Sequence, residues 1–269
     1  MRVEGRVLAA WAVVLAGPGC QADGLPAYET PSRLQSIVSE AQRVQGMDVR
    51  AWVRYRFDWR AEREELDETG EVETRDDLEF LVTPDTDGFR EELLRHNGAE
   101  ASDQEKEELL RSASFDKHYR TLIAGDEGEA RGGYSVGQLL HLASYRYVGQ
   151  ETIHGVACYR LDFQPGDVEP LTGGLAARFT RAMQGSLWIT VEGFHLAAAR
   201  AETVRPITLL PALSKVYSLA VQMESGPVGD GVWLPVKVQV DSRARVLFKS
   251  IRRRNRFTYS DFSRIVPPA

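Results

Sequence analysis

One serine stands in a spacing that is used for nucleophilic catalysis. Residues 133–137 read G-x-S-x-G, with Ser135 at the centre. In the nucleophile elbow, this pattern needs a buried strand before the serine, a helix after it, and an acid and a histidine later in the chain. A short apolar stretch at 136–143 follows, but a polar, glycine-rich segment precedes it. We therefore interpret the match as a loop, and keep a secreted serine hydrolase using Ser135 as a minor alternative.

Histidine and cysteine do not form a metal-binding pattern. The five histidines show no H-E-x-x-H spacing. His154 and Cys158 are four residues apart, but His154 precedes a turn glycine and Cys158 lies in an apolar stretch, where a small buried residue is the simpler interpretation. There is no phosphate loop and no dinucleotide fingerprint. The sequence predicts no catalytic residue, no metal and no cofactor.

The N-terminus has the layout of an export signal. Arg2 and Arg6 precede an apolar run at 7–16, which is too short to span a bilayer. Cys20 then stands where a bacterial lipoprotein carries its lipid-modified first mature residue. The alternative is ordinary cleavage after Ala22. We expect residues 1–22 to be signal peptide and tether, and the protein to reside in the periplasm or at the outer membrane, with Cys20 as a possible lipid attachment site.

Composition and charge restrict the remaining possibilities. The chain has 269 residues, a formal net charge of −6 and two cysteines. A nucleic-acid binder is normally basic overall, so no nucleic-acid partner is expected. Two cysteines are too few for a disulfide scaffold. The length allows one all-β domain or two smaller domains, and nothing fixes the oligomeric state.

Helical and strand periodicities divide the mature chain. Thr30 and Pro31 open a helix, apolar residues at helical spacing continue it, and Gly46 ends it. From residue 49 the period changes to two, and we expect strands at 49–66, 71–83 and 88–95, with a turn at Asn97 and Gly98. Ser102 and Glu105 form a capping box for a helix ending near 112.

Strands dominate the second half. We expect them at 145–153, 156–164, 185–190, 194–204, 215–224, 232–241 and 245–262, with a helical connection at 175–183. About ten antiparallel strands and a few helices favour a mainly β (α+β) fold in one domain, residues 30–265. The expected architecture is a single curved antiparallel sheet or unclosed β-barrel.

Several strand and turn motifs together resemble a known family. Residues 147–155 contain V-G-x-E-x-I-x-G, 185–189 read G-S-L-W-I, 233–235 read W-L-P and 257–262 read F-T-Y-S-D-F. With the N-terminal helix and the charged hairpin around 66–70, this order resembles the outer-membrane lipoprotein-sorting (LolA-like) family. The resemblance implies an open barrel with helices covering its apolar concave side, which holds acyl chains. The insert at 97–143 departs from the small sorting chaperone's pattern.

Charge is unevenly distributed along the chain. Residues 60–108 hold 19 acidic and 6 basic residues, whereas residues 243–256 hold 7 basic and no acidic ones. We interpret these segments as strand faces that pair with each other across the sheet. The alternative is that Arg252, Arg253, Arg254 and Arg256 contact anionic lipid headgroups or an acidic partner.

The connection at 206–213 is unusually apolar, so it is either a buried plug or a lid over a ligand cavity. The first hypothesis is a non-enzymatic envelope protein that binds lipid or a lipidated partner protein and contacts the membrane through its lipid anchor. The second is an envelope sensor or structural interaction module with a packed core. Candidate ligand-binding residues are Trp52, the connection residues Leu209, Leu210 and Leu213, and the helix residues Leu34, Ile37 and Val38.

Overall fold

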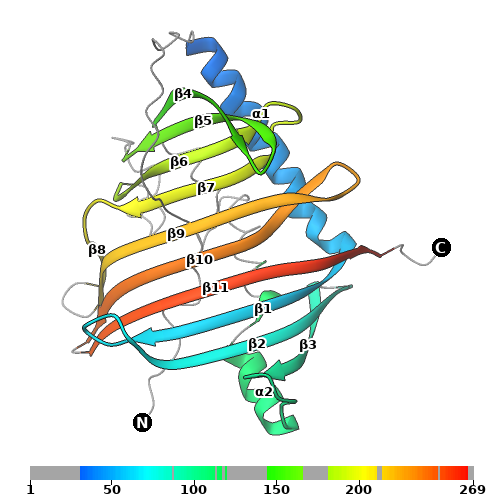
Figure 1. Cartoon of the computed structure of the whole chain (residues 1–269), viewed down its shortest axis with the longest axis vertical. Helices are drawn as coiled ribbons and strands as arrows, with labels where there is room; N and C mark the ends of the chain where they lie inside the picture. The colour runs from blue at the N-terminus through cyan, green and yellow to red at the C-terminus, as the bar shows by residue number, and fades with distance from the viewer. Residues whose placement is uncertain are drawn as a thin grey trace.

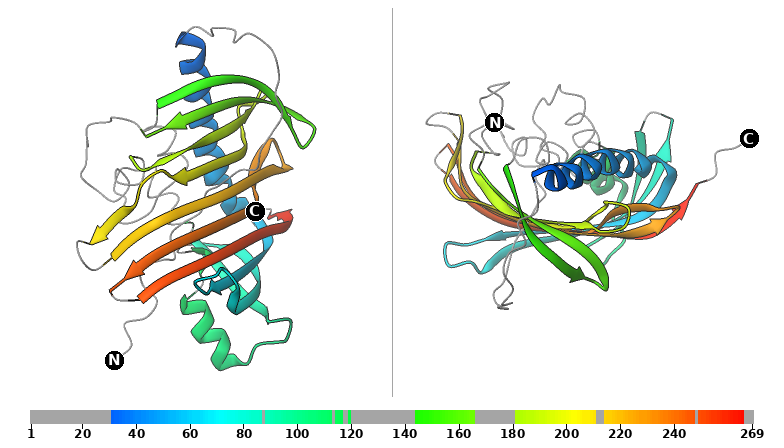
Figure 2. Two further views of the ribbon diagram at one scale, coloured as in Figure 1. Left: turned by 60° about the vertical axis from the view of Figure 1, so that its left-hand side comes forward. Right: turned by 90° about the horizontal axis from the view of Figure 1, so that it is seen from above.

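A computed structural model describes residues 31–86, 88–112, 114–116, 119, 144–165, 181–210, 214–247 and 249–265. Its strands form one 11-stranded antiparallel sheet that curves without closing, because β3 and β4 end the strand order without pairing to each other (Figure 1). A long helix, α1, lies on the concave side of this sheet (Figure 2). The expected fold class, an unclosed curved sheet with helices, is confirmed.

The sheet brings the two ends of the domain together, because β1 pairs with β11. The strand order is β3-β2-β1-β11-β10-β9-β7-β6-β5-β4, and β8 pairs with β9. The element bounds are α1 Pro31–Ala51, a 3-10 turn Trp52–Arg54, β1 Tyr55–Leu66, β2 Val72–Asp85, β3 Gly88–His96, α2 Asp103–Ser112, β4 Ser144–Ile153, β5 Val156–Gln164, β6 Met183–Thr190, β7 Leu196–Thr203, β8 Ile207–Leu210, β9 Ser214–Gly229, β10 Val232–Val246 and β11 Lys249–Arg264.

The N-terminal helix extends beyond its expected end at Gly46. Val44, Asp48 and Ala51 are all buried and continue the helical spacing of four and three residues. A glycine inside a helix costs about 1 kcal/mol relative to alanine, and this buried face outweighs that cost. The strand expected from residue 49 therefore begins only at Tyr55.

Local signals for turns and bulges agree with the structure. In the first turn, φ is 49° at His154 and 83° at Gly155. In the second, φ is 50° at Asn97 and 79° at Gly98. Two successive positive φ angles suit the right-handed twist of a hairpin. The capping box also forms, because the Ser102 hydroxyl donates to Glu105 at 2.6 Å.

Three sequence expectations about the second half are wrong. The connection at 206–213 contains a strand, β8, which pairs with β9 at Ile207 and Val216. The helical connection expected at 175–183 cannot extend to residue 183, because Met183 is the first residue of β6. Residues 166–180 lie outside the described part of the chain. β9 and β10 are longer than expected, with β-bulges in their pairing, whereas β11 begins at Lys249 and not at 245, because 245 and 246 belong to β10.

The two faces of the sheet differ in character. Side chains alternate between faces, so Leu187 and Ile189 enter the main apolar core while Ser186 and Trp188 point to the opposite, convex face. Gly185 is required by close packing, because a Cβ there would lie 1.6 Å from the carbonyl oxygen of Arg200. The main core therefore lies on the concave side, between the sheet and α1.

Candidate functional site

The concave face is the apolar surface on which the candidate ligand-binding residues of the helix converge. Ile37 and Val38 are 3% and 7% exposed and belong to the main core, and Leu34 packs against the same core from a partly buried position. In Figure 2 the helix crosses the sheet diagonally on its concave side, and it approaches β4 and β10. The structure thus places all three helix residues toward the concave face.

Trp52 occupies a packed aromatic cluster at the end of α1. Its ring centroid lies 4.8 Å from that of Phe57, 5.0 Å from Phe115 and 5.3 Å from Tyr259. Trp52 is 2% exposed, and burial raises the pKa of Tyr259. This end of the concave side is therefore filled by protein side chains, and Trp52 is part of that filling.

A buried polar contact attaches the end of α1 to the sheet. The sequence motifs did not predict it. Asp48 Oδ2 lies 2.7 Å from His195 Nδ1, and the Trp233 amide donates to Asp48 Oδ1 at 3.2 Å. Burial raises the pKa of Asp48, and the contacts with His195 and Trp233 offset part of that effect. The available signal was that Asp48 continues the apolar face of the helix, where a charge needs a partner.

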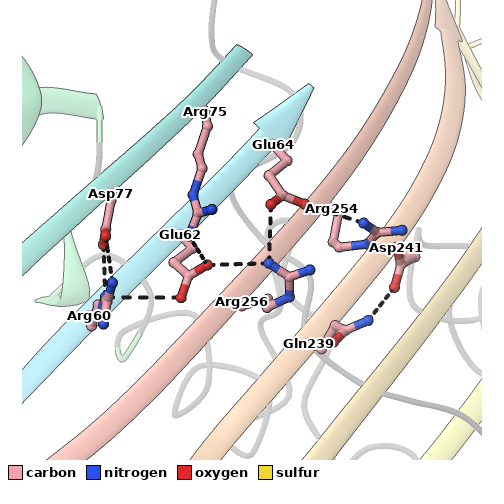
Figure 3. A network of polar contacts seen from close by, with 9 residues as sticks. All are labelled: Arg60, Glu62, Glu64, Arg75, Asp77, Gln239, Asp241, Arg254 and Arg256. Atoms are coloured by element: carbon pink, nitrogen blue, oxygen red, sulfur yellow. Dashed lines mark hydrogen bonds and ion pairs between the residues drawn. The ribbon is translucent and has the colours of Figure 1, made fainter. Parts of the chain in front are cut away.

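The convex face carries an ionic network along β2, β1, β11 and β10 (Figure 3). Arg256 lies 3.2 Å from both Glu62 and Glu64, and Arg254 lies 2.9 Å from Asp241. The predicted pairing of the acidic and basic segments across the sheet is confirmed. Their network consists of Arg60, Glu62, Glu64, Arg75, Asp77, Gln239, Asp241, Arg254 and Arg256.

The other two arginines proposed for headgroup contact also have partners within the chain. Arg253 donates to Glu65 through Nε at 2.8 Å, and Arg252 Nη1 reaches the carbonyl oxygen of Glu68 at 3.4 Å. An arginine already held by a carboxylate gains less from a further anion. All four arginines considered for headgroup contact are therefore accounted for by partners inside the protein.

A second convex cluster surrounds Trp188. Its indole N–H donates to Glu151 at 2.7 Å, and the guanidinium groups of Arg160 and Arg200 lie 5.7 and 5.2 Å from its ring centroid. Cys158 is fully buried in the apolar part of this cluster, and burial raises the pKa of its thiol. The prediction that Cys158 is a small buried residue is confirmed.

Some predicted site residues lie outside the described part of the chain. These are Cys20, Ser135 and Leu213, together with the side chains of Leu209 and Leu210, whose backbone forms β8. Within the described ranges, no group of three or more His, Cys, Asp or Glu residues is arranged to hold a metal ion. None of the described helices combines the length and apolar character needed to cross a membrane.

Comparison with known proteins gives likeness to solved structures only. No family model and no curated protein matches the sequence. A LolA superfamily protein from Nitrosomonas europaea is 13% identical, with 87% of this chain and 94% of that chain covered and a TM-score of 0.34. A putative outer membrane lipoprotein-sorting protein domain from Vibrio parahaemolyticus is 11% identical, with the same coverage and a TM-score of 0.36. The lipoprotein LppX from Mycobacterium tuberculosis is 13% identical, with 86% and 97% covered and a TM-score of 0.27. The first two names contain the family that the sequence motifs resemble.

Proposed function

We propose that this protein is a non-enzymatic component of the bacterial envelope that binds lipid, or the acyl chains of a lipidated partner, against the concave face of its sheet. The observation that carries the proposal is the contrast between the two faces. The concave face is apolar from β5 to β2, whereas the convex face carries a network of ion pairs across β2, β1, β11 and β10. Acyl chains gain free energy from such a face in proportion to the apolar area removed from water.

The size of the helix supports the proposal. The ten strands that neighbour one another from β3 to β4 make the sheet about 43 Å wide at the usual interstrand spacing. The 21 residues of α1 form a rod about 31 Å long and about 10–12 Å wide. Its apolar stripe therefore covers part of the concave face, and acyl chains would lie beside or beneath it.

A second candidate is an envelope sensor or interaction module with a packed core. The aromatic cluster around Trp52, Phe57 and Phe115 favours it, because these rings fill one end of the concave side without any ligand. The two functions differ in whether the remainder of the face accepts acyl chains.

Organic extraction of the natively purified full chain, followed by mass spectrometry, tests the proposal. The carrier function predicts a co-purifying acyl lipid in near-stoichiometric amount and displacement of a fluorescent fatty-acyl probe by that lipid. A clean extract together with no probe binding would contradict it and support the packed module.

A matched pair of helix variants locates the binding. Leu34→Asp places a charge on the face of α1 that packs toward the core, whereas Gln35→Asp changes its exposed neighbour. We expect Leu34→Asp to weaken probe binding at least about tenfold, because burying an unpaired carboxylate against acyl chains is costly. Equal probe binding by the two folded variants would place the ligand away from this helix face.

A further inference from the structure

The concave face changes from apolar to polar along β1. Trp59 and Ala61 are 4% and 0% exposed and belong to the main core. Arg63 continues the same alternation, and the register with β2 and β11 shows no shift between residues 59 and 64. Arg63 therefore lies on the concave side, whereas its neighbours Glu62 and Glu64 join the convex ionic network.

Arg63 is partly buried and has no counter-charge in contact. Throughout the described residues, no carboxylate lies within 4.0 Å of its guanidinium group, although ion pairs are frequent elsewhere on β1. Burial lowers the pKa of Arg63, the attraction of Asp76 offsets part of this effect, and Arg253 adds to it. A partly buried cation without a partner costs stability, so the position requires another explanation.

The charged groups that face Arg63 are already engaged. Asp76, opposite it on β2, has a side chain 57% exposed that lies 3.6 Å from His96. On β11, the residue directly opposite Arg63 is Asn255. The next pair on the concave face of β1 and β11 is Glu65 with Arg253, which form an ion pair with each other. The local arrangement therefore leaves one guanidinium available for an oxyanion.

A second donor on the same face also lacks a partner. The indole Nε1 of Trp59 is the one fully buried side-chain nitrogen or oxygen without a hydrogen bond among the described residues. Its ring stacks on Phe80 at 4.9 Å and on Phe257 at 6.3 Å. The indole N–H therefore lies within the packed aromatic core, and Arg63, which is only partly buried, is the donor on this strand face that an external anion can reach.

We propose that Arg63 binds the oxyanion of an acyl lipid whose chain lies on the concave side of the sheet. The proposal rests on the proposed function, because it assigns the headgroup end of the same site. Arg63 and Trp59 are four residues apart, which places their Cα atoms about 13 Å from each other along the strand. Because Ala61 and Trp59 are buried by protein side chains, the methylene groups would lie over this core and not between its members.

The test compares lipids that differ only at the head. Binding of hexadecanoic acid and of hexadecanol to the full chain is measured by displacement of a fluorescent fatty-acyl probe, and inorganic phosphate is tested as a competitor. We expect the acid to bind at least about tenfold more tightly than the alcohol. Arg63→Met should abolish that preference while leaving the affinity for hexadecanol within about twofold. Arg245→Met, at an exposed arginine of β10, should leave both affinities unchanged.

The outcomes separate this proposal from the proposed function. Equal affinity of the wild type for acid and alcohol, or an equal loss of both in Arg63→Met, would overturn the headgroup site while lipid binding stands. Binding of neither lipid by the wild type would overturn both. Competition by millimolar inorganic phosphate that disappears in Arg63→Met, without any preference between the two lipids, would show a free-anion site and overturn the lipid assignment.

Discussion

Asp48 Oδ2 and His195 Nδ1 lie 2.7 Å apart, although 147 residues separate them in the chain. The pair connects the last turns of α1 with the turn between β6 and β7, and the amide of Trp233 on β10 donates to the same carboxylate. The His195 ring also stacks on Trp233, with centroids 5.7 Å apart. One end of the helix is therefore fixed to two separate parts of the sheet by directional contacts.

Removal of His195 should loosen this end of α1. His195→Ala leaves the Asp48 carboxylate buried with only the Trp233 amide as partner, and we expect a loss of about 1–3 kcal/mol in the free energy of unfolding. Urea denaturation measures the loss, and hydrogen exchange should show faster opening at residues 44–51. His154→Asn is the control, because His154 is exposed in a turn with a positive φ angle that asparagine tolerates. Equal stability of the two variants would show that the pair does not hold the helix.

The convex network makes stability depend on pH through Asp77. Two hydrogen bonds from Arg60, at 2.9 and 2.6 Å, lower the pKa of Asp77 below its ordinary value of 3.8. The unfolded chain therefore takes up this proton at a higher pH than the folded protein does. The stabilisation is present above pH 3.8 and is lost as the pH falls through the lower, folded-state pKa.

Asp77→Asn should therefore destabilise the protein at neutral pH by up to about 1 kcal/mol, as for a partly exposed ion pair, and the difference should disappear in acid. Urea titrations at a series of pH values measure the difference between variant and wild type. Glu73→Gln, at an exposed position on the same strand, should show a smaller difference at neutral pH. A deficit of Asp77→Asn that stays constant down to low pH would contradict this origin.

Periodicity and turn chemistry predicted most of the fold. The period-two segments and the pairs His154-Gly155 and Asn97-Gly98 act locally, so they could be identified without tertiary information. The end of α1 could not, because Trp52 is buried by contacts with Phe57 and Tyr259 that only the folded sheet supplies. The strand β8 was hidden for a similar reason, since its pairing with β9 outweighs the proline signals around it.

The candidate site was only partly readable from the sequence. The apolar face of α1 is visible in the spacing of Leu34, Ile37 and Val38, and the structure turns it toward the concave core. Nothing in the sequence distinguishes Arg63 from the paired arginines, because the difference lies in which face each side chain occupies and what stands opposite. The sequence shows that Asp48 continues the apolar face of the helix, but not that His195 is its partner, because that contact arises from the way α1 crosses the sheet.

The N-terminal sequence predicts a lipid-modified first residue of the mature protein. We expect Cys20 to be the first residue of the mature protein, because it follows the apolar run at 7–16. Intact mass spectrometry of protein from membranes should show added diacylglycerol, and Cys20→Ser should abolish that mass and release the protein from the membrane fraction. A mature protein that begins at Asp23 would show ordinary cleavage instead.

The lid hypothesis for residues 206–213 applies to the part beyond Ile207, since Ile207 is 3% exposed and already belongs to the main core. Leu209→Asp combined with Leu210→Asp should weaken binding of a fluorescent fatty-acyl probe strongly and barely change the melting temperature. Calorimetry and probe titration on the same samples separate the possibilities. A loss of several kcal/mol in the free energy of unfolding would show that these two leucines belong to the core. Ile207 of the same strand already does, and it pairs with Val216 of β9.

Arg63→Met should stabilise the protein in the absence of ligand. The substitution removes a partly buried positive charge that has no ion pair among the described residues. Methionine also replaces arginine with a long, flexible apolar side chain. A residue retained for ligand binding at a cost to stability should behave in this way, whereas a structural arginine should not. We expect the melting temperature to stay equal or rise by a few degrees, while Arg253→Met, which removes the partner of Glu65, should lower it. A clear drop in the melting temperature of Arg63→Met would mean that the guanidinium group stabilises the fold itself, and the rationale for an oxyanion at this end of the concave face would then be lost.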